Sequence, residues 1–279
     1  NHKNPHNEKF DKLIFIVIDA LRSDFMFSSN SSMFHLHDLL NNNAAIGFTG
    51  FSNPPTVTLP RLKGITTGST SSFLDAILNI NEDDTSSSSN LINQDSWLKQ
   101  FKISKRKDSE ESGIHFFGDD TWLKLFPGFF DKHDGTSSFF VSDFTEVDNN
   151  VTRHINAELA NDQEWDGLIL HYLGLDHIGH KNGPNSVFMP AKQRELDDII
   201  YKIYSQYAVP KYEKPDSERV LMVVLGDHGM NEICNHGGSS ISETSAALAF
   251  ISPIFEKENS TYLDLSNKDS LSIPPTHDY

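Results

Sequence analysis

Three short apolar runs, each followed by an aspartate, most strongly constrain what this chain can fold into. The runs cover residues 13–18, 168–173 and 220–225, and they lead to Asp19, Asp176 and Asp227. Nearly continuous apolar runs of this length, separated by helical patterns, are typical of a parallel sheet covered on both faces. Parallel strands end at one edge of a sheet, so three carboxylates at strand ends can converge on one small volume. We therefore predict a two-metal site.

Other segments extend this pattern. Residues 114–118, 138–141 and 246–251 are further strand candidates, and residues 189–204 show a helical stripe that begins beside Pro190. The predicted fold class is α/β, with a mostly parallel central sheet and helices on both faces.

The chain length favours a single domain. With 279 residues and 37% hydrophobic content, the chain can bury one large α/β core. We expect that core over about residues 12–253. Residues 82–90 and 102–111 are polar or charged, so the stretch 82–111 is predicted to form insertion-like loops, and residues 256–279 are predicted to form a polar tail.

Charge and processing signals narrow the function classes. A net charge of -16 and a pI near 5.1 argue against a nucleic-acid surface. No apolar stretch approaches the ~20 residues that span a bilayer, and no signal peptide precedes the first strand. Since the chain begins without Met, we expect it to be an excised part of a larger protein. Sequons at Asn30, Asn150 and Asn259 are consistent with a lumenal setting.

The candidate metal ligands fall into short groups. Asp176 and His180 are four residues apart, a spacing that brings them to one side of a helical turn. We expect Gly179 to let the backbone bend between them. Asp227 and His228 form a second group, and His236 can fold back toward them. Mixed Asp and His ligation favours Zn²⁺, allows Mn²⁺ and disfavours Ca²⁺.

Ordinary explanations compete with this hypothesis. Any single histidine among the thirteen in the chain is better explained as a polar residue at a strand end. The combination of ligands at separate strand ends is what indicates a metal site. The lone cysteine, Cys234, excludes an internal disulfide and is expected to be a small packed residue.

A nucleophile for such a site is predicted within residues 54–60 (PPTVTLP), ahead of a helix expected to begin near Arg61. Thr58 lies beside that helix start, where free N–H groups and the helix dipole favour an alkoxide and a phosphate. Thr56 is the rival, and position alone does not separate the two.

Several motifs together resemble a known family. VIDALRSDF, PPTVTLPRLKGITTG, DHIGH and GDHGM with HGGSS are similar to the alkaline phosphatase superfamily and its nucleotide pyrophosphatase and phosphodiesterase branch. FVSDFTEVDNNVTRH, at residues 140–154, resembles the glycosylphosphatidylinositol (GPI) ethanolamine phosphate transferases, of the fungal type that modifies the second mannose. The resemblance covers about residues 12–253.

The resemblance implies roles for individual residues. It assigns one zinc to Asp19, Thr58, Asp227 and His228, and the other to Asp176, His180 and His236. It makes Thr58 the nucleophile, and it makes Asn79 a donor to the phosphoryl oxygen, with a helix cap as the alternative for Asn79.

The resemblance also implies an activity. It is transfer of phosphoethanolamine from phosphatidylethanolamine to a mannose hydroxyl of the GPI precursor, the 6-hydroxyl of the second mannose, through a phospho-threonine intermediate. The enzyme would act on the lumenal side of the endoplasmic reticulum, beside a membrane region that is absent from this chain and with a possible partner subunit. A phosphodiesterase that uses water, and a non-catalytic lumenal glycolipid-binding domain, are the alternatives.

Polar residues beside these motifs have open roles. Within residues 140–154, Asp143, Glu146 or Asp148 could pair with an ammonium group, or the segment could serve as a cap and turn. His177 could support a metal ligand or be solvated.

Overall fold

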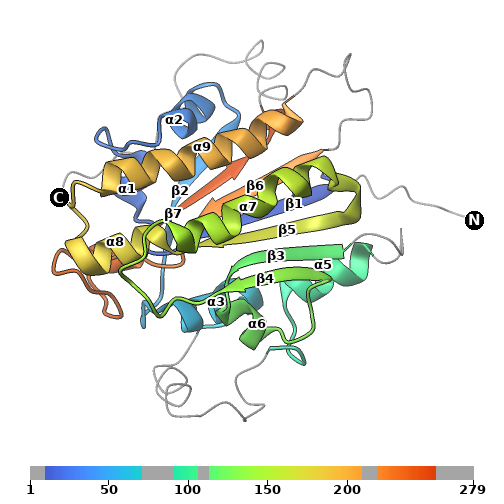
Figure 1. Ribbon diagram of the computed structural model, residues 1–279, viewed down its shortest axis with the longest axis horizontal. Helices are drawn as coiled ribbons and strands as arrows, with labels where there is room; N and C mark the ends of the chain where they lie inside the picture. The colour runs from blue at the N-terminus through green and yellow to red at the C-terminus, as the bar shows by residue number, and fades with distance from the viewer. Residues whose placement is uncertain (1–9, 71–90, 106–112, 209–218, 256–279) are drawn as a thin grey trace, which may run out of the picture.

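A seven-stranded sheet forms the centre of the computed structural model, which describes residues 10–70, 91–105, 113–208 and 219–255 (Figure 1). The strand order is β2-β7-β6-β1-β5-β3-β4. β7 runs antiparallel to both β2 and β6, and the other neighbouring pairs are parallel. The strands are β1 (Lys12–Ile18), β2 (Ala45–Phe51), β3 (Gly113–Asp119), β4 (Lys132–Thr136), β5 (Trp165–Tyr172), β6 (Val220–Leu225) and β7 (Ser245–Ile251).

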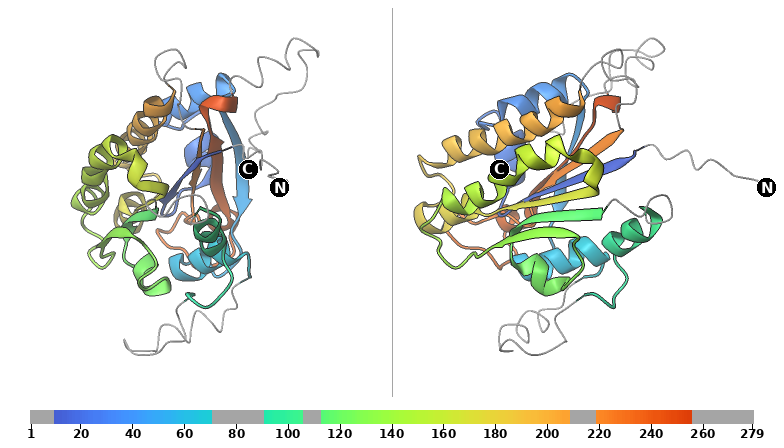
Figure 2. Two further views of the ribbon diagram at one scale, coloured as in Figure 1. Left: turned by 90° about the vertical axis from the view of Figure 1, so that its right-hand side faces the viewer. Right: turned by 45° about the vertical axis from the view of Figure 1, so that its right-hand side comes forward.

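Helices cover both faces of this sheet, as the edge-on view of Figure 2 shows. One layer contains α1 (Ser23–Phe27), α2 (Phe34–Asn41), α7 (Glu146–Ala160), α8 (Gly174–Asn182) and α9 (Met189–Tyr207). The other contains α3 (Thr58–Thr67), α5 (Trp97–Lys105) and α6 (Thr121–Leu125). The described residues also contain two short helices, η1 (Asp162–Glu164) and α10 (Ile241–Thr244). Among the described residues, none of the helices combines the length and the apolar character that a membrane span requires.

Strand β1 shows why the apolar runs are nearly continuous. Successive side chains of a strand point to opposite faces of the sheet. Accordingly Ile14, Ile16 and Ile18 join the core beneath α7 and α9, while Phe15 and Val17 join the core beneath α3 and α5. A strand with a helical layer on each side must be apolar at every position, which confirms the predicted fold class.

The predicted strand at residues 138–141 is wrong. The chain has no regular secondary structure at residues 137–140, and Phe139 and Phe140 are 88% and 72% exposed. The strand of this region is β4, whose polar sequence KHDGT gave no signal. Among the described strands, β4 pairs only with β3 and lies at one edge of the sheet, so it does not need apolar residues on both faces.

Strand β2 was not predicted. It lies at the opposite edge of the sheet, where β7 is its one partner among the strands that the structure describes. Its sequence, AIGFTGF, contains two glycines, and most of its side chains are partly or fully exposed. Strands of this kind lack the continuous apolar run on which the other strand predictions rest.

The predicted loop region at residues 82–111 is partly wrong. Residues 97–105 form α5, whose Leu98 is buried while Trp97 and Phe101 pack against the same core. Lys99, Lys102 and Lys105 interrupt the apolar pattern of this segment in the sequence, although none of them is fully exposed. Residues 82–90, residues 106–111 and the predicted tail at 256–279 lie outside the described residues.

Candidate metal centre

The three aspartates come together at the carboxyl edge of the sheet. Asp19 is the first residue after β1, Asp227 is the second after β6, and Asp176 lies in the first turn of α8, which follows β5. Because β6, β1 and β5 are neighbours, their ends lie side by side. The exposed fractions of Asp19, Asp176 and Asp227 are only 2%, 7% and 0%.

One cluster consists of Asp19, Asp227 and His228. His228 Nε2 lies 3.4 Å from Asp19 Oδ1 and 3.3 Å from Asp227 Oδ2. All three atoms are buried and have no hydrogen-bond partner. Two backbone amides, those of Ala20 and His228, instead donate to Asp227 Oδ1 at 3.2 and 2.9 Å, so that Oδ2 is left facing the cluster.

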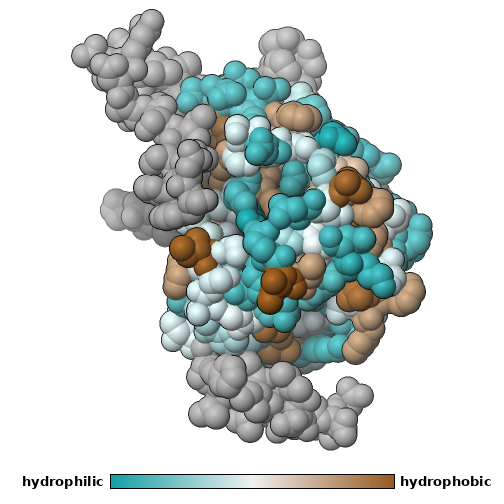
Figure 3. Space-filling model, turned by 90° about the vertical axis from the view of Figure 1, so that its left-hand side faces the viewer, coloured by the Kyte–Doolittle hydropathy of each residue, from teal (hydrophilic) through white to brown (hydrophobic). Residues whose placement is uncertain are grey.

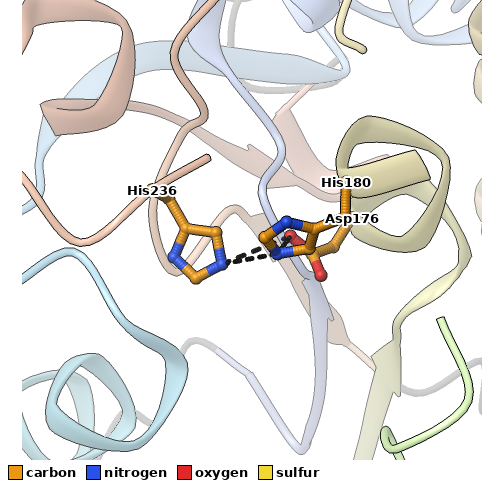
Figure 4. Close-up of side chains that lie close together, drawn as sticks. All are labelled: Asp176, His180 and His236. Carbon is orange, nitrogen blue, oxygen red and sulfur yellow. Dashed lines mark hydrogen bonds and ion pairs between the residues drawn. The ribbon is translucent and has the colours of Figure 1, made fainter. Parts of the chain in front are cut away.

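A second cluster consists of Asp176, His180 and His236 (Figure 4). His180 and His236 hold their Nε2 atoms 3.4 and 3.6 Å from Asp176 Oδ1, and the two Nε2 atoms are 3.0 Å apart. Asp176 Oδ1 is another buried atom without a hydrogen-bond partner. Asp176 and His180 lie one helical turn apart on α8, as their spacing predicted.

These separations fit zinc ligation. Ligand atoms about 2.0–2.1 Å from a tetrahedral zinc stand about 3.3 Å from one another, close to the distances within both clusters. The imidazoles are also oriented for it: Nδ1 of His180, His228 and His236 lies 2.7–3.2 Å from a backbone carbonyl oxygen. A carbonyl can only accept, so the proton of each ring lies on Nδ1 and the lone pair of Nε2 faces the cluster.

The carboxylates disfavour one another in the metal-free chain. Burial, and then the charges of Asp19 and Asp227, raise the pKa of Asp176 well above its usual value. Burial and Asp19 also raise the pKa of Asp227. Burial opposes ionisation of Asp19 as well, but His171 and His228 outweigh it and lower that pKa. Three carboxylates in one dry volume are therefore suited to divalent cations.

The prediction that Gly179 lets the backbone bend is wrong. Gly179 lies inside the regular helix α8, so the backbone does not bend there. A Cβ atom at this position would lie 2.3 Å from the sulfur of Met230. The glycine instead leaves room on α8 for the buried side chain of Met230, from the loop that follows β6.

Thr58, and not Thr56, faces the first cluster. Thr58 Oγ1 donates to Asp19 Oδ2 at 3.1 Å. α3 begins at Thr58 itself, three residues earlier than predicted, so this hydroxyl lies at the positive end of the helix dipole. Thr56 is fully buried, and its hydroxyl donates to Gly238 O and accepts from Gly237 N. Thr56 therefore holds the loop that carries His236.

Segment 140–154 supports α8. Asp148 is fully buried and paired with Lys192 at 3.0 Å, so the prediction that it could bind an ammonium ligand is wrong. Its Oδ1 accepts from the amides of Leu173 and Gly174, at the start of α8. Asp143 accepts from two amides at the start of α7, which is the predicted cap and turn role. Glu146 is exposed.

Two supporting residues have different surroundings from those expected. His177 is 1% exposed, so it is not solvated, and its Nδ1 lies 2.7 Å from Asp143 O. Cys234 is partly exposed, and its carbonyl oxygen is the partner of His180. Asn79 lies outside the described residues, so its suggested role stays a prediction.

Two buried residues beside Asp19 were missed. Asp119 ends β3 and His171 lies near the end of β5, and both have ligand atoms within 4.8 Å of Asp19. The strand-end rule could have found Asp119, since it follows the apolar run 114–118. His171 lies inside an apolar run, and no sequence signal marks it.

His236 should make the metal-free chain sensitive to acid. Burial, and then His228, lower the pKa of His236 from 6.5 to about 4. Between these pH values the unfolded chain binds a proton that the folded chain does not, so the free energy of unfolding should fall as pH decreases from 6.5 to about 4. The loss should be on the order of 2–3 kcal/mol. Urea unfolding in chelator should show it, and His236→Gln should remove most of it; an identical fall in both chains would contradict the prediction.

Asp176→Asn should have opposite effects with and without metal. Without metal, the change removes a buried carboxylate that Asp19 and Asp227 repel, so the free energy of unfolding should rise. With zinc, the cluster of His180 and His236 loses its only carboxylate, and the variant should bind one zinc fewer. Paired unfolding curves in chelator and in zinc test this. A variant that is less stable than the parent in chelator would contradict it.

Comparison with known proteins agrees with this architecture. A mostly parallel sheet between helical layers, with Asp and His clusters at its carboxyl edge, is the architecture expected from the resemblance to alkaline-phosphatase-like proteins. The chain belongs to the type I phosphodiesterase / nucleotide pyrophosphatase family, whose model matches residues 13–245.

Comparison with full-length relatives confirms the resemblance to GPI ethanolamine phosphate transferases. The chain is 61% identical over 254 residues to GPI ethanolamine phosphate transferase 2 of Debaryomyces hansenii, and 59% identical over 269 residues to that of Eremothecium gossypii. These matches cover 90% and 96% of this chain but only 27% and 31% of those relatives. The chain therefore spans about a third of their length or less.

A solved structure supports the fold. The zinc complex of the C-terminal periplasmic domain of EcEptC from Escherichia coli aligns with a TM-score of 0.56 and 12% identity. The alignment covers 91% of this chain and 76% of that domain. At this identity the likeness concerns the fold alone.

Proposed function

We propose that this chain is the catalytic domain of a phosphoethanolamine transferase that acts on the GPI precursor. The donor is phosphatidylethanolamine, and the acceptor is a mannose hydroxyl, the 6-hydroxyl of the second mannose. The observation that carries the proposal is the hydroxyl of Thr58, which lies 3.1 Å from Asp19 at the start of α3. The identity to relatives named GPI ethanolamine phosphate transferase 2 supports this choice of substrates.

The reaction divides into two displacements at phosphorus. Thr58 Oγ attacks the phosphorus of the donor, the bond to the diacylglycerol oxygen breaks, and phosphoethanolamine becomes attached to Thr58. The mannose hydroxyl then attacks the same phosphorus, and Thr58 is released. In the first turn of α3, Pro60 has no N–H and Arg61 N–H donates to Val57 O, so the N–H groups of Thr58 and Leu59 are the ones that would donate to a phosphoryl oxygen.

Two zinc ions are the proposed cofactors, and Mn²⁺ is the alternative. Asp19, Thr58, Asp227 and His228 would hold one, and Asp176, His180 and His236 the other. When bound, such ions lower the pKa of a hydroxyl and offset the negative charge that develops at phosphorus. Ligand separations near 3.3 Å and the Nδ1 hydrogen bonds of all three imidazoles support this assignment.

Exposed apolar side chains near the site suit a lipid substrate. Figure 3 looks onto the edge of the sheet that carries the clusters, and it shows separate apolar patches among polar residues. The large apolar residues that are exposed in the segments at this edge are Phe51, Val57, Phe139, Phe140, Val141, Val187, Phe188, Ile233 and Ile241. Apolar residues that rim a polar centre are typical of a site for a lipid or a membrane surface.

The proposed setting is the lumenal side of the endoplasmic reticulum membrane, within a larger protein that has a membrane region and acts with a partner subunit. Asn30 is exposed and Asn150 is partly exposed, so both sequons are accessible to glycosylation, while Asn259 lies outside the described residues. The acidic net charge of -16 supports a protein without a nucleic-acid partner.

A transfer assay tests the proposal. The longer protein is incubated with phosphatidylethanolamine labelled in its headgroup, with and without a GPI acceptor. Labelled acceptor that requires Thr58 supports the transferase. Free phosphoethanolamine at the same rate with or without acceptor would favour the alternative, a phosphodiesterase of the matched family.

A further inference from the structure

A third buried cluster lies beside the two described above. Asp19, Asp119 and His171 come from the neighbouring strands β1, β3 and β5, and each offers a ligand atom within 4.8 Å of the others. His171 is fully buried, and its Nε2 has no hydrogen-bond partner. The residue types would suit either a third cation or a hydrogen bond between His171 and a carboxylate.

The other nitrogen of His171 decides between these possibilities. Trp122 Nε1 lies 2.9 Å from His171 Nδ1, and both side chains are fully buried. An indole N–H can only donate, so Nδ1 of His171 must accept. The ring proton of His171 therefore lies on Nε2. This is the opposite tautomer to that of His180, His228 and His236, whose Nδ1 atoms face carbonyl oxygens.

Asp19 is the nearest acceptor for that proton. His171 Nε2 lies 3.6 Å from Asp19 Oδ2, and the same oxygen accepts the hydrogen bond of Thr58. The other oxygen, Oδ1, faces His228. A separation of 3.6 Å is longer than a hydrogen bond, but the bonds of such sites are often long before the ligand is bound and then tighten.

We propose that His171 is a positioning residue for Asp19, with Trp122 fixing the direction of its hydrogen bond. His171 donates to Asp19 Oδ2, and this holds Oδ1 toward His228 and the first metal. Because Nε2 carries the proton, His171 has no lone pair to offer, and the third cluster does not bind a cation. The inference builds on the proposed function only in treating Asp19 as a metal ligand.

Zinc titration of two variants separates a donor from a ligand. Glutamine can present an N–H close to the position of imidazole Nε2 but is a poor zinc ligand, while leucine presents no polar group. His171→Leu should weaken zinc binding by about 10–100-fold, as is usual when a partner of a ligand is lost. His171→Gln should recover most of that loss, and each chain should bind two zinc ions at saturation. Three zinc ions in the parent chain, with one lost in both variants, would overturn the proposal.

The tautomer can be measured without metal or substrate. In chains labelled with ¹⁵N at histidine and kept in chelator, a long-range ¹H–¹⁵N spectrum should show His171 protonated at Nε2, with assignment by His171→Gln. His228 should be protonated at Nδ1, which lies 2.9 Å from Gly229 O. A proton on Nδ1 of His171 would overturn the proposal. Since this measurement needs no activity, its failure is distinct from failure of the transfer assay.

A final control addresses packing. If His171 served only to fill space, His171→Leu and His171→Gln would bind zinc as tightly as the parent, and that result would also overturn the proposal. Trp122→Phe keeps most of the ring volume but removes the indole donor. It should allow the His171 proton to occupy Nδ1 in part, and the same spectrum would detect the change.

Discussion

Thr58→Ala should abolish phosphoryl transfer, with a loss of at least about 10³-fold in kcat. The change removes the hydroxyl that lies against Asp19 at the start of α3 and leaves the carboxylates and imidazoles of both clusters intact. Zinc content should therefore stay at two per chain. Headgroup-labelled phosphatidylethanolamine gives the rate, and elemental analysis of the same sample gives the metal content.

Matched variants make this result specific. Thr58→Ser retains a hydroxyl and should keep measurable activity. Thr56→Ser retains the hydroxyl that bonds Gly237 and Gly238, so it should leave activity nearly unchanged. If Thr58→Ala kept more than a tenth of the parental rate, Thr58 would not be the attacking group.

Asp148→Ala should destabilise the fold more than any surface change. The substitution leaves Lys192 as a buried charge without its buried partner and removes the acceptor for two amides at the start of α8. Breaking a buried ion pair on one side typically costs about 3–5 kcal/mol. Urea unfolding of the metal-free chain should show a loss of this size.

Glu195 provides the control for this prediction. It is the second carboxylate partner of Lys192, at 2.9 Å, but its side chain is 40% exposed. Glu195→Ala should cost about 1 kcal/mol or less, as surface ion pairs usually do. If Asp148→Ala and Glu195→Ala lowered the free energy of unfolding by similar amounts, the buried pair of Asp148 and Lys192 would not be the stabilising contact that we predict.

The central strands of the sheet were predictable because burial on both faces requires a continuous apolar run in the sequence. A strand covered on both faces must be apolar throughout, so β1, β5 and β6 are visible as runs. The ends of these strands then place Asp19, Asp176 and Asp227 at one edge. The edge strands β2 and β4 have no such apolar run, because each pairs with a single described strand and has exposed side chains.

The supporting contacts were not predictable, since each joins residues that are far apart in the chain. Asp148 is paired with Lys192, 44 positions away, and Trp122 donates to His171, 49 positions away. The sequence does not show that Lys192 is the partner of Asp148, so Asp148 looked available for an ammonium ligand. The proton position on each imidazole likewise depends on which group the fold places against Nδ1.

Anomalous diffraction at the zinc absorption edge, from crystals of this chain grown with zinc, tests the proposed centre most directly. Two peaks should appear, one among Asp19, Thr58, Asp227 and His228 and the other among Asp176, His180 and His236. No peak should lie between Asp119 and His171. A single peak, an absence of peaks, or metals distant from Thr58 would contradict the proposal that paired cations activate this threonine.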